Sequence, residues 1–123
     1  MPFRVIGFHH YSLLVRDIDR ASEFYGSILG LRRKPRPDFG MAGIWYEMPG
    51  GQELHIIESP DVAAVHEGHP AFEIDDIRAA VSACALGKGS LQQDTFTRAH
   101  DGSLSAFVRD PDGNLIEFTQ HGP

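Results

Sequence analysis

The chain has 123 residues, of which 41% are hydrophobic and 23% charged, and its net charge is −6 with the histidines neutral. This length predicts one domain large enough to bury a core, and the composition is typical of a soluble globular protein. The negative charge argues against a nucleic-acid partner. The single cysteine, Cys84, excludes an intrachain disulfide framework and fits a reducing compartment. No signal peptide and no apolar run of membrane length is recognisable, so we expect a cytoplasmic protein with no membrane partner.

The first half of the chain predicts one helix among four strands. Tyr11, Leu13 and Val15 share one face by period two, which indicates a strand. Asp17 is a good helix N-cap, apolar residues then recur at helical spacing, and Gly30 is a typical stop. In chain order we expect a strand at 8–15, a helix at 18–29 and strands at 31–36, 42–48 and 52–58.

The second half repeats this order of elements after a polar connector at 59–67. Asp75 and Asp76 precede a helical pattern, and Cys84 lies within it, which favours a buried structural thiol. In this half we expect a strand at 69–74, a helix at 77–86 and strands at 91–98, 103–109 and 115–120. The repeat predicts a single α+β domain over residues 1–123, made of two tandem βαβββ modules at 6–58 and 68–121.

Residues 110–118 predict a tight turn that leads into the last strand. Pro111 presets its own φ angle, Asp112 can bond to the nearby backbone, and Gly113 can adopt positive φ. In the strand that follows, Ile116 and Phe118 point into the core and Glu117 points to the opposite face. Taken alone, Glu117 is typical of a solvated surface residue.

The repeat gives Glu117 three partners of metal-binding type. His10 and His69 lie on the first strands of the two modules, and His55 and Glu117 lie on the last strands, at nearly matching offsets. All four point away from the apolar face of their own strand. Three imidazoles and a carboxylate suit Zn²⁺, Ni²⁺, Fe²⁺, Mn²⁺ or Co²⁺. The remaining histidines are expected at the surface or beside the ligands without binding the metal, with His9 on the opposite side of its strand; they are His9, His66, His100 and His121.

One short basic run stands out in this acidic chain. It comprises Arg32, Arg33, Lys34 and Arg36. The run is either a solvated strand and loop or a patch that attracts an anionic substrate. Arg98 and Arg109 are further anion contacts or exposed structural charges.

Three motifs resemble the vicinal oxygen chelate superfamily, which includes glyoxalase I, extradiol dioxygenases and the fosfomycin- and bleomycin-resistance proteins. The motifs are His10-Tyr11-Ser12-Leu13-Leu14-Val15-Arg16-Asp17 with Glu23-Phe24-Tyr25 and Leu29-Gly30-Leu31; Gly68-His69-Pro70-Ala71-Phe72-Glu73-Ile74-Asp75-Asp76; and Phe107-Val108-Arg109-Asp110-Pro111-Asp112-Gly113-Asn114-Leu115-Ile116-Glu117. Together they span nearly the whole chain. The resemblance implies two modules that form a curved sheet around a cleft, with a divalent metal on the cleft floor.

The resemblance places His10, His69 and Glu117 on metal positions. For the fourth ligand, His55 fits the family pattern of a ligand followed by two apolar residues better than its competitor Glu53 does. A histidine at this position departs from the family pattern, in which the fourth ligand is usually a carboxylate or an amide. Trp45 and Phe107 are candidates for lining the substrate cleft, although aromatic residues on strands are more often core.

The resemblance implies a homodimer, with the metal site built either within one chain or across two. It implies a metal-dependent lyase or isomerase that acts on a small substrate with adjacent oxygens, with Glu117 as a base. One alternative is a metal-free protein of the bleomycin-resistance kind that sequesters a drug or other ligand. A further alternative is an extradiol-type dioxygenase, although His55 fills a position that oxygen chemistry prefers open. Nothing in the sequence marks a thiol or CoA co-substrate.

Overall fold

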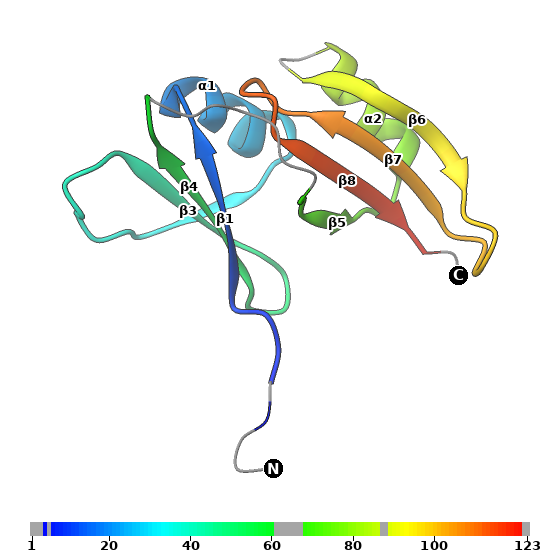
Figure 1. The fold of residues 1–123 in the computed structure, drawn as a ribbon, viewed down its shortest axis with the longest axis horizontal. Coiled ribbons are helices and arrows are strands. Elements are labelled where there is room, and N and C mark those ends of the chain that lie inside the picture. The colour runs from blue at the N-terminus through cyan, green and yellow to red at the C-terminus, as the bar shows by residue number, and fades with distance from the viewer. Residues whose placement is uncertain (1–3, 5, 61–67, 87–88, 122–123) are drawn as a thin grey trace.

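The computed structural model describes residues 4, 6–60, 68–86 and 89–121, so most of the predicted connector at 59–67 lies outside the described residues. The first half forms β1 (His10–Val15), β2 (Arg32–Lys34), β3 (Gly43–Glu47) and β4 (Glu53–Glu58), and the second forms β5 (Ala71–Glu73), β6 (Ser90–Thr97), β7 (Leu104–Arg109) and β8 (Leu115–Gln120). The two sheets have the same strand order, β1-β4-β3-β2 and β5-β8-β7-β6. The predicted repeat of βαβββ units is therefore confirmed (Figure 1).

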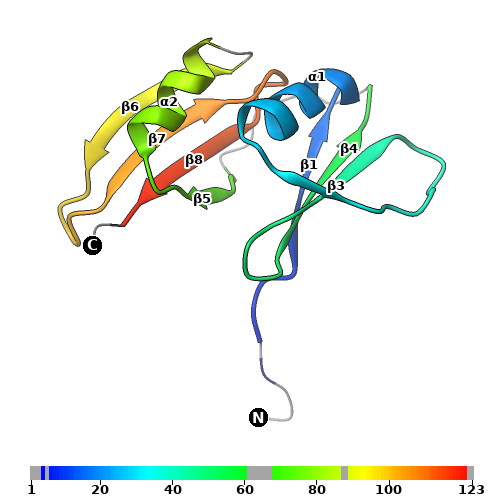
Figure 2. The ribbon, with the colours of Figure 1, turned by 180° about the vertical axis from the view of Figure 1, so that it is seen from behind.

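The helices lie on the same side of the molecule, α1 beside the first sheet and α2 against β6, β7 and β8 (Figures 1 and 2). The helical segment of the first module comprises α1 (Ile18–Ser22) and the π-helical η1 (Glu23–Ile28), and the helix of the second module is α2 (Ile77–Leu86). The carboxylate of Asp17 accepts hydrogen bonds from the backbone N–H groups of Asp19 and Arg20, as its N-cap position predicts. Gly30 ends the helical segment at φ +71°. No helix in the described part of the chain is long and apolar enough to cross a membrane.

The core lies between the helices and one face of each sheet. In the first sheet, the alternate residues Leu54 and Ile56 are buried in the same core cluster as Phe24 and Tyr25 of η1. In the second, Ile116 and Phe118 are fully buried, as the strand parity of residues 115–120 predicts. This parity leaves the other face of each sheet for His10, His55 and Glu117, because successive side chains on a strand point to opposite faces.

Side chains, rather than a continuous strand ladder, join the two modules. Within the described residues no ladder links β1 to β5, so the predicted curved sheet consists of two separate four-stranded sheets. The hydroxyl of Tyr25 donates to Asp110 Oδ2 at 2.7 Å, and Arg20 Nη2 lies 2.9 Å from Asp112 Oδ1. The turn before β8 is thus bonded to the first helix. The two modules are held at the helix side, and no helix among the described residues covers the opposite faces of the sheets.

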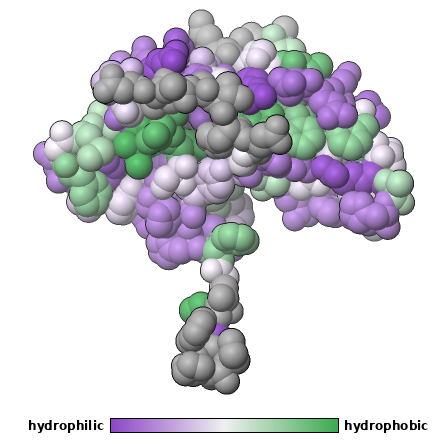
Figure 3. Space-filling model, viewed as in Figure 1, coloured by the Kyte–Doolittle hydropathy of each residue, from purple (hydrophilic) through white to green (hydrophobic). Residues whose placement is uncertain are grey.

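Residues 6–9, just before β1, extend away from the body (Figures 1 and 3). Ile6 and Phe8 on this segment are 93% and 91% exposed. Phe8 also lines a cavity of about 1210 Å³, whose walls include His10 of β1 and the residues of β5. This cavity lies between the edge strands of the two sheets.

Candidate metal centre

The first group of predicted ligands is a stack of three rings on the face of the first sheet that lies opposite the core. The His55 ring lies between His10, with ring centroids 4.2 Å apart, and Trp45, at 4.5 Å, and both ring pairs are nearly parallel. Strand register produces this arrangement, because β4 pairs with both β1 and β3 and puts Trp45 directly opposite His55. His55 is only 9% exposed as a result. Trp45, predicted to line a cleft, therefore lies against a predicted ligand.

Glu53, the competitor for the fourth ligand position, is engaged by two neighbours. Its Oε1 lies 2.8 Å from His55 Nε2, and its Oε2 accepts a hydrogen bond from Lys34 Nζ. These hydrogen bonds, that from His55 foremost, lower the pKa of Glu53 to about 2. Glu53 is therefore ionised at neutral pH and holds His55 by one of its ring nitrogens. Carboxylates that orient a ligating imidazole in this way are common beside metal sites.

The surroundings of His10 favour its neutral form. Desolvation lowers the pKa of His10, and the neighbouring His55 and His9 lower it further. A lowered pKa favours the neutral imidazole, which is the form that ligates metals. His9, predicted at the surface or beside the ligands, is exposed, and its Nδ1 lies 2.9 Å from Nδ1 of His10; it precedes β1, so strand alternation does not apply to it.

The second group of predicted ligands lies on the other sheet. His69 Nε2 is 3.0 Å from Glu117 Oε1. The other carboxylate oxygen of Glu117, Oε2, accepts hydrogen bonds from Arg98 Nη2 and Ser105 Oγ, both at 3.2 Å. Phe107, the second predicted cleft residue, packs edge-on against the His69 ring at 5.3 Å between centroids.

Arg98 and Ser105 are contacts of Glu117 that the sequence reasoning missed. Arg98 was expected as an anion contact or an exposed charge, but its Nε also donates to Ser105 Oγ at 2.8 Å, so the three side chains form one network. Ser105 is fully buried and pairs with Thr119 on β8. The sequence feature that could have indicated this contact is Ser105, a small polar residue on the strand that pairs with the strand of Glu117. Arg109, the other predicted anion contact, instead donates to Gln92 and to the Gly113 carbonyl.

One chain does not bring the four predicted ligands into a single cluster. Within residues 4, 6–60, 68–86 and 89–121, no group of three or more His, Cys, Asp or Glu side chains is placed to hold a metal ion. His10 and His69 line the same cavity of about 1210 Å³, but His55 and Glu117 do not line it. We call His10 with His55 the first half-site, and His69 with Glu117 the second half-site.

Comparison with known proteins gives the family. Residues 7–118 match the model of the Glyoxalase/Bleomycin resistance protein/Dioxygenase superfamily. The chain belongs to this superfamily. Lactoylglutathione lyase of Haemophilus influenzae is 31% identical over 91% of this chain and 90% of that protein. Lactoylglutathione lyase of Neisseria meningitidis serogroup A is also 31% identical, over 90% and 88%.

Solved structures agree with this assignment to the glyoxalase superfamily. A glyoxalase family protein from Bacillus anthracis matches with a TM-score of 0.82 at 25% identity, covering 99% of this chain and 100% of that one. A fosfomycin resistance protein from Listeria monocytogenes matches with a TM-score of 0.79 at 16% identity, covering 97% and 96%, and this likeness concerns the fold alone. The family model and the lyase relatives support a glyoxalase-like function for this chain.

Proposed function

We propose that this protein is a divalent-metal-dependent enzyme with lyase or isomerase chemistry on a small substrate that carries adjacent oxygens. The observation that carries the proposal is the pair of half-sites, which occupy equivalent positions on two equivalent sheets, each on the face away from the helices. Three imidazoles and one carboxylate fit Zn²⁺, Ni²⁺, Fe²⁺, Mn²⁺ or Co²⁺. The neutral state favoured at His10 fits the same use.

In this proposal His10, His55, His69 and Glu117 hold the metal, and Glu53 orients His55 without ligating. Glu53 is committed to His55 and Lys34 through both of its oxygens, which supports His55 as the ligand. When bound, the metal supplies a Lewis acid that polarises a substrate oxygen. Glu117 presents Oε1 on the side of His69, while Arg98 and Ser105 hold Oε2. For Glu117 to act as a base as well, its Oε2 must give up these hydrogen bonds before it can accept a proton.

We infer that the complete metal site forms between two copies of the chain. Each chain supplies two ligands at each of two places, and no helix in the described part of the chain lies over the sheet faces that carry them. A twofold axis that sets the first half-site of one copy against the second half-site of another would complete two sites per dimer. In this arrangement the second copy covers the exposed sheet faces and also completes the ligand set of the metal.

A second candidate is a metal-free protein that sequesters an organic ligand. The observation in its favour is the cavity of about 1210 Å³, whose lining includes Phe8, Tyr11 and Phe72. Cavities of this size with aromatic walls accommodate whole organic ligands. Metal analysis of protein purified without chelator separates the two candidates. The enzyme proposal fails if less than about 0.1 equivalent of transition metal binds and added metal does not raise the melting temperature, since a specific ligand stabilises the native state.

Paired variants test the arrangement across two chains. His10→Ala with His55→Ala removes the first half-site, and His69→Ala with Glu117→Gln removes the second. Each double variant alone should bind no metal, whereas a heterodimer purified through two different tags should bind about one metal ion, because one of its two sites keeps all four ligands. An empty heterodimer, with metal bound by the wild type, would place the site within one chain. His100→Ala is the matched control, since His100 is an exposed histidine outside both half-sites.

A further inference from the structure

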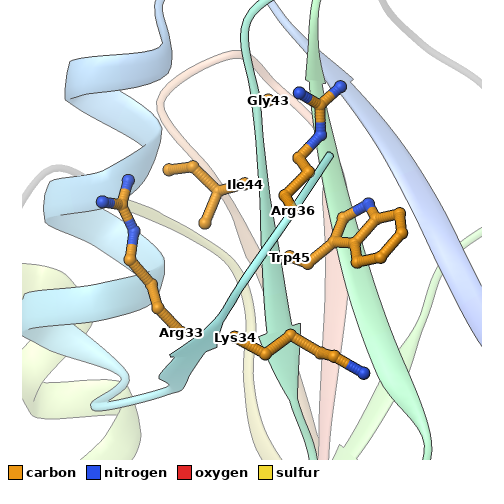
Figure 4. A pocket seen from close by; sticks show the side chains of 6 residues that line it. All are labelled: Arg33, Lys34, Arg36, Gly43, Ile44 and Trp45. Carbon is orange, nitrogen blue, oxygen red and sulfur yellow. The ribbon is translucent and has the colours of Figure 1, made fainter. Parts of the chain in front are cut away.

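The arginines of the basic run and Arg98 of the second module differ in what they reach. Figure 4 shows Arg33 and Arg36 on opposite sides of β3, so these two guanidinium groups cannot contact one anion together. Arg98, in contrast, contacts a proposed metal ligand directly, because its Nη2 lies 3.2 Å from Glu117 Oε2. Arg98 is therefore a cation of the second half-site.

The backbone of Arg98 is fixed by the turn between β6 and β7. Its N–H donates to the Ser103 carbonyl at 2.8 Å, and its carbonyl accepts a hydrogen bond from the Gly102 N–H at 2.9 Å. Its guanidinium lies over the Phe96 ring, 5.3 Å from the centroid, and the side chain is 33% exposed. These contacts support the direction in which Arg98 reaches Glu117 on β8.

The two carboxylate oxygens of Glu117 have different neighbours. Oε1 lies 3.0 Å from His69 Nε2, so it lies beside the other proposed ligand of this half-site. Oε2 accepts hydrogen bonds from Arg98 Nη2 and Ser105 Oγ, each at 3.2 Å. Ser105 Oγ also accepts a hydrogen bond from Arg98 Nε at 2.8 Å, which leaves its own hydrogen for Oε2. Arg98 therefore holds Oε2 both directly and through Ser105.

We propose that Arg98 is a positioning residue that keeps Oε2 of Glu117 away from the metal, so that Glu117 ligates through Oε1 alone. A carboxylate can otherwise ligate through one oxygen or through both. Here Oε2 can ligate only after it loses two charge-assisted hydrogen bonds. A substrate with adjacent oxygens needs two positions at the metal, and ligation by one oxygen of Glu117 keeps one more position open. The proposal rests on the proposed function, because it concerns how Glu117 would hold the metal.

Co²⁺ is the probe for this role, because its visible absorption depends on the number and geometry of its ligands. Metal-free protein is titrated with Co²⁺ at constant pH and ionic strength, and the spectrum and the affinity are both recorded. In Arg98→Ala the second oxygen of Glu117 is free to ligate, so the absorption should weaken as the coordination number rises. The Co²⁺ affinity should rise about tenfold, because a nearby positive charge is removed and a second oxygen becomes available. A merely structural role of Arg98 would lower the affinity instead.

Three further variants show whether the effect passes through Oε2. Arg98→Lys keeps the charge but loses the fork that reaches Glu117 and Ser105 together, so its spectrum should lie between those of the wild type and Arg98→Ala. Ser105→Ala removes one of the two donors and should change the spectrum in the same direction by a smaller amount. Arg109→Ala is the matched control, because Arg109 belongs to the same sheet and donates to other groups, and it should leave both readouts unchanged. The melting temperature of the metal-free protein checks the folding of each variant.

The proposed role of Arg98 is overturned if Arg98→Ala keeps the wild-type spectrum, if its Co²⁺ affinity falls, or if Arg109→Ala changes the spectrum equally. When the wild type binds Co²⁺, any of these results leaves the proposed function standing and removes only the role of Arg98. A wild type that binds no transition metal overturns both.

Discussion

The hydroxyl of Tyr25 should stabilise the contact between the two modules, and Tyr25→Phe measures by how much. Tyr25 is fully buried, and its hydroxyl donates to Asp110 Oδ2 at 2.7 Å. Asp110 also accepts hydrogen bonds from the backbone N–H of Asp112 and from the backbone and side-chain N–H groups of Asn114. The variant leaves three donors on a buried carboxyl group, so we expect the free energy of unfolding to fall by about 1–3 kcal/mol. The melting temperature should fall by roughly 3–10 °C, which thermal and urea unfolding can both resolve.

Tyr46→Phe is the control for this prediction because it makes the same chemical change in the same core. Tyr46 is fully buried, its ring centroid lies 6.4 Å from that of Tyr25, and its hydroxyl has no hydrogen-bond partner among the described residues. Removing an unsatisfied buried hydroxyl should leave stability unchanged or raise it. Equal losses in the two variants would refute the reasoning, since the bond to Asp110 would then not account for the effect.

Three further predictions concern single sites. Gly89→Ala should lower the free energy of unfolding by about 1–3 kcal/mol in urea denaturation, because a Cβ at Gly89 would lie 2.7 Å from Phe24 Cε1. Burial raises the pKa of the Cys84 thiol to about 11, so a thiol reagent at about pH 8 should label the native protein only at its unfolding rate and the denatured protein at once. The pKa of Glu53 is lowered to about 2, so the stability that its ionised form contributes is present above the unfolded value of 4.5 and is lost as the pH falls toward 2. The urea concentration at the unfolding midpoint should therefore fall between pH 4.5 and pH 2 in the wild type, and it should fall less steeply over this range in Glu53→Gln.

The order of elements was predictable from the sequence because each depends on local pattern. The alternation of Leu13 and Val15 predicted β1, and Asp17 predicted the start of α1. The predicted boundaries lie within two residues of the observed ones. The π-helical geometry of η1 was not predicted, because the apolar spacing of residues 18–29 was interpreted with the period of an α-helix. The turn at residues 110–113 was recognisable, but its buried contact with Tyr25 joins positions 85 residues apart, and no local pattern encodes that.

Strand parity predicted which residues share a face, but not what each touches there. The parity of β4 placed Glu53 beside His55, but that Lys34 and His55 contact the two carboxylate oxygens of Glu53 is seen only in the structure. Arg98 is a similar case: a lone arginine at the end of a strand has many directions available, and its contact with Glu117 depends on the register between β6, β7 and β8. The roles of these residues toward a metal remain predictions.

The internal repeat has a consequence for how such a site can be assembled. Two equivalent modules imply a twofold relation between their half-sites, and a twofold axis can relate modules of one chain or modules of two chains with the same sequence pattern. In this chain the contacts of Tyr25 and Arg20 with the turn before β8 hold the modules together on the helix side. The proposed docking of a second copy would bring two ligand-bearing faces together without any change in these contacts. The proposed site shared between two chains is therefore compatible with the hydrogen bond that Tyr25→Phe removes, and the heterodimer experiment tests it independently of that bond.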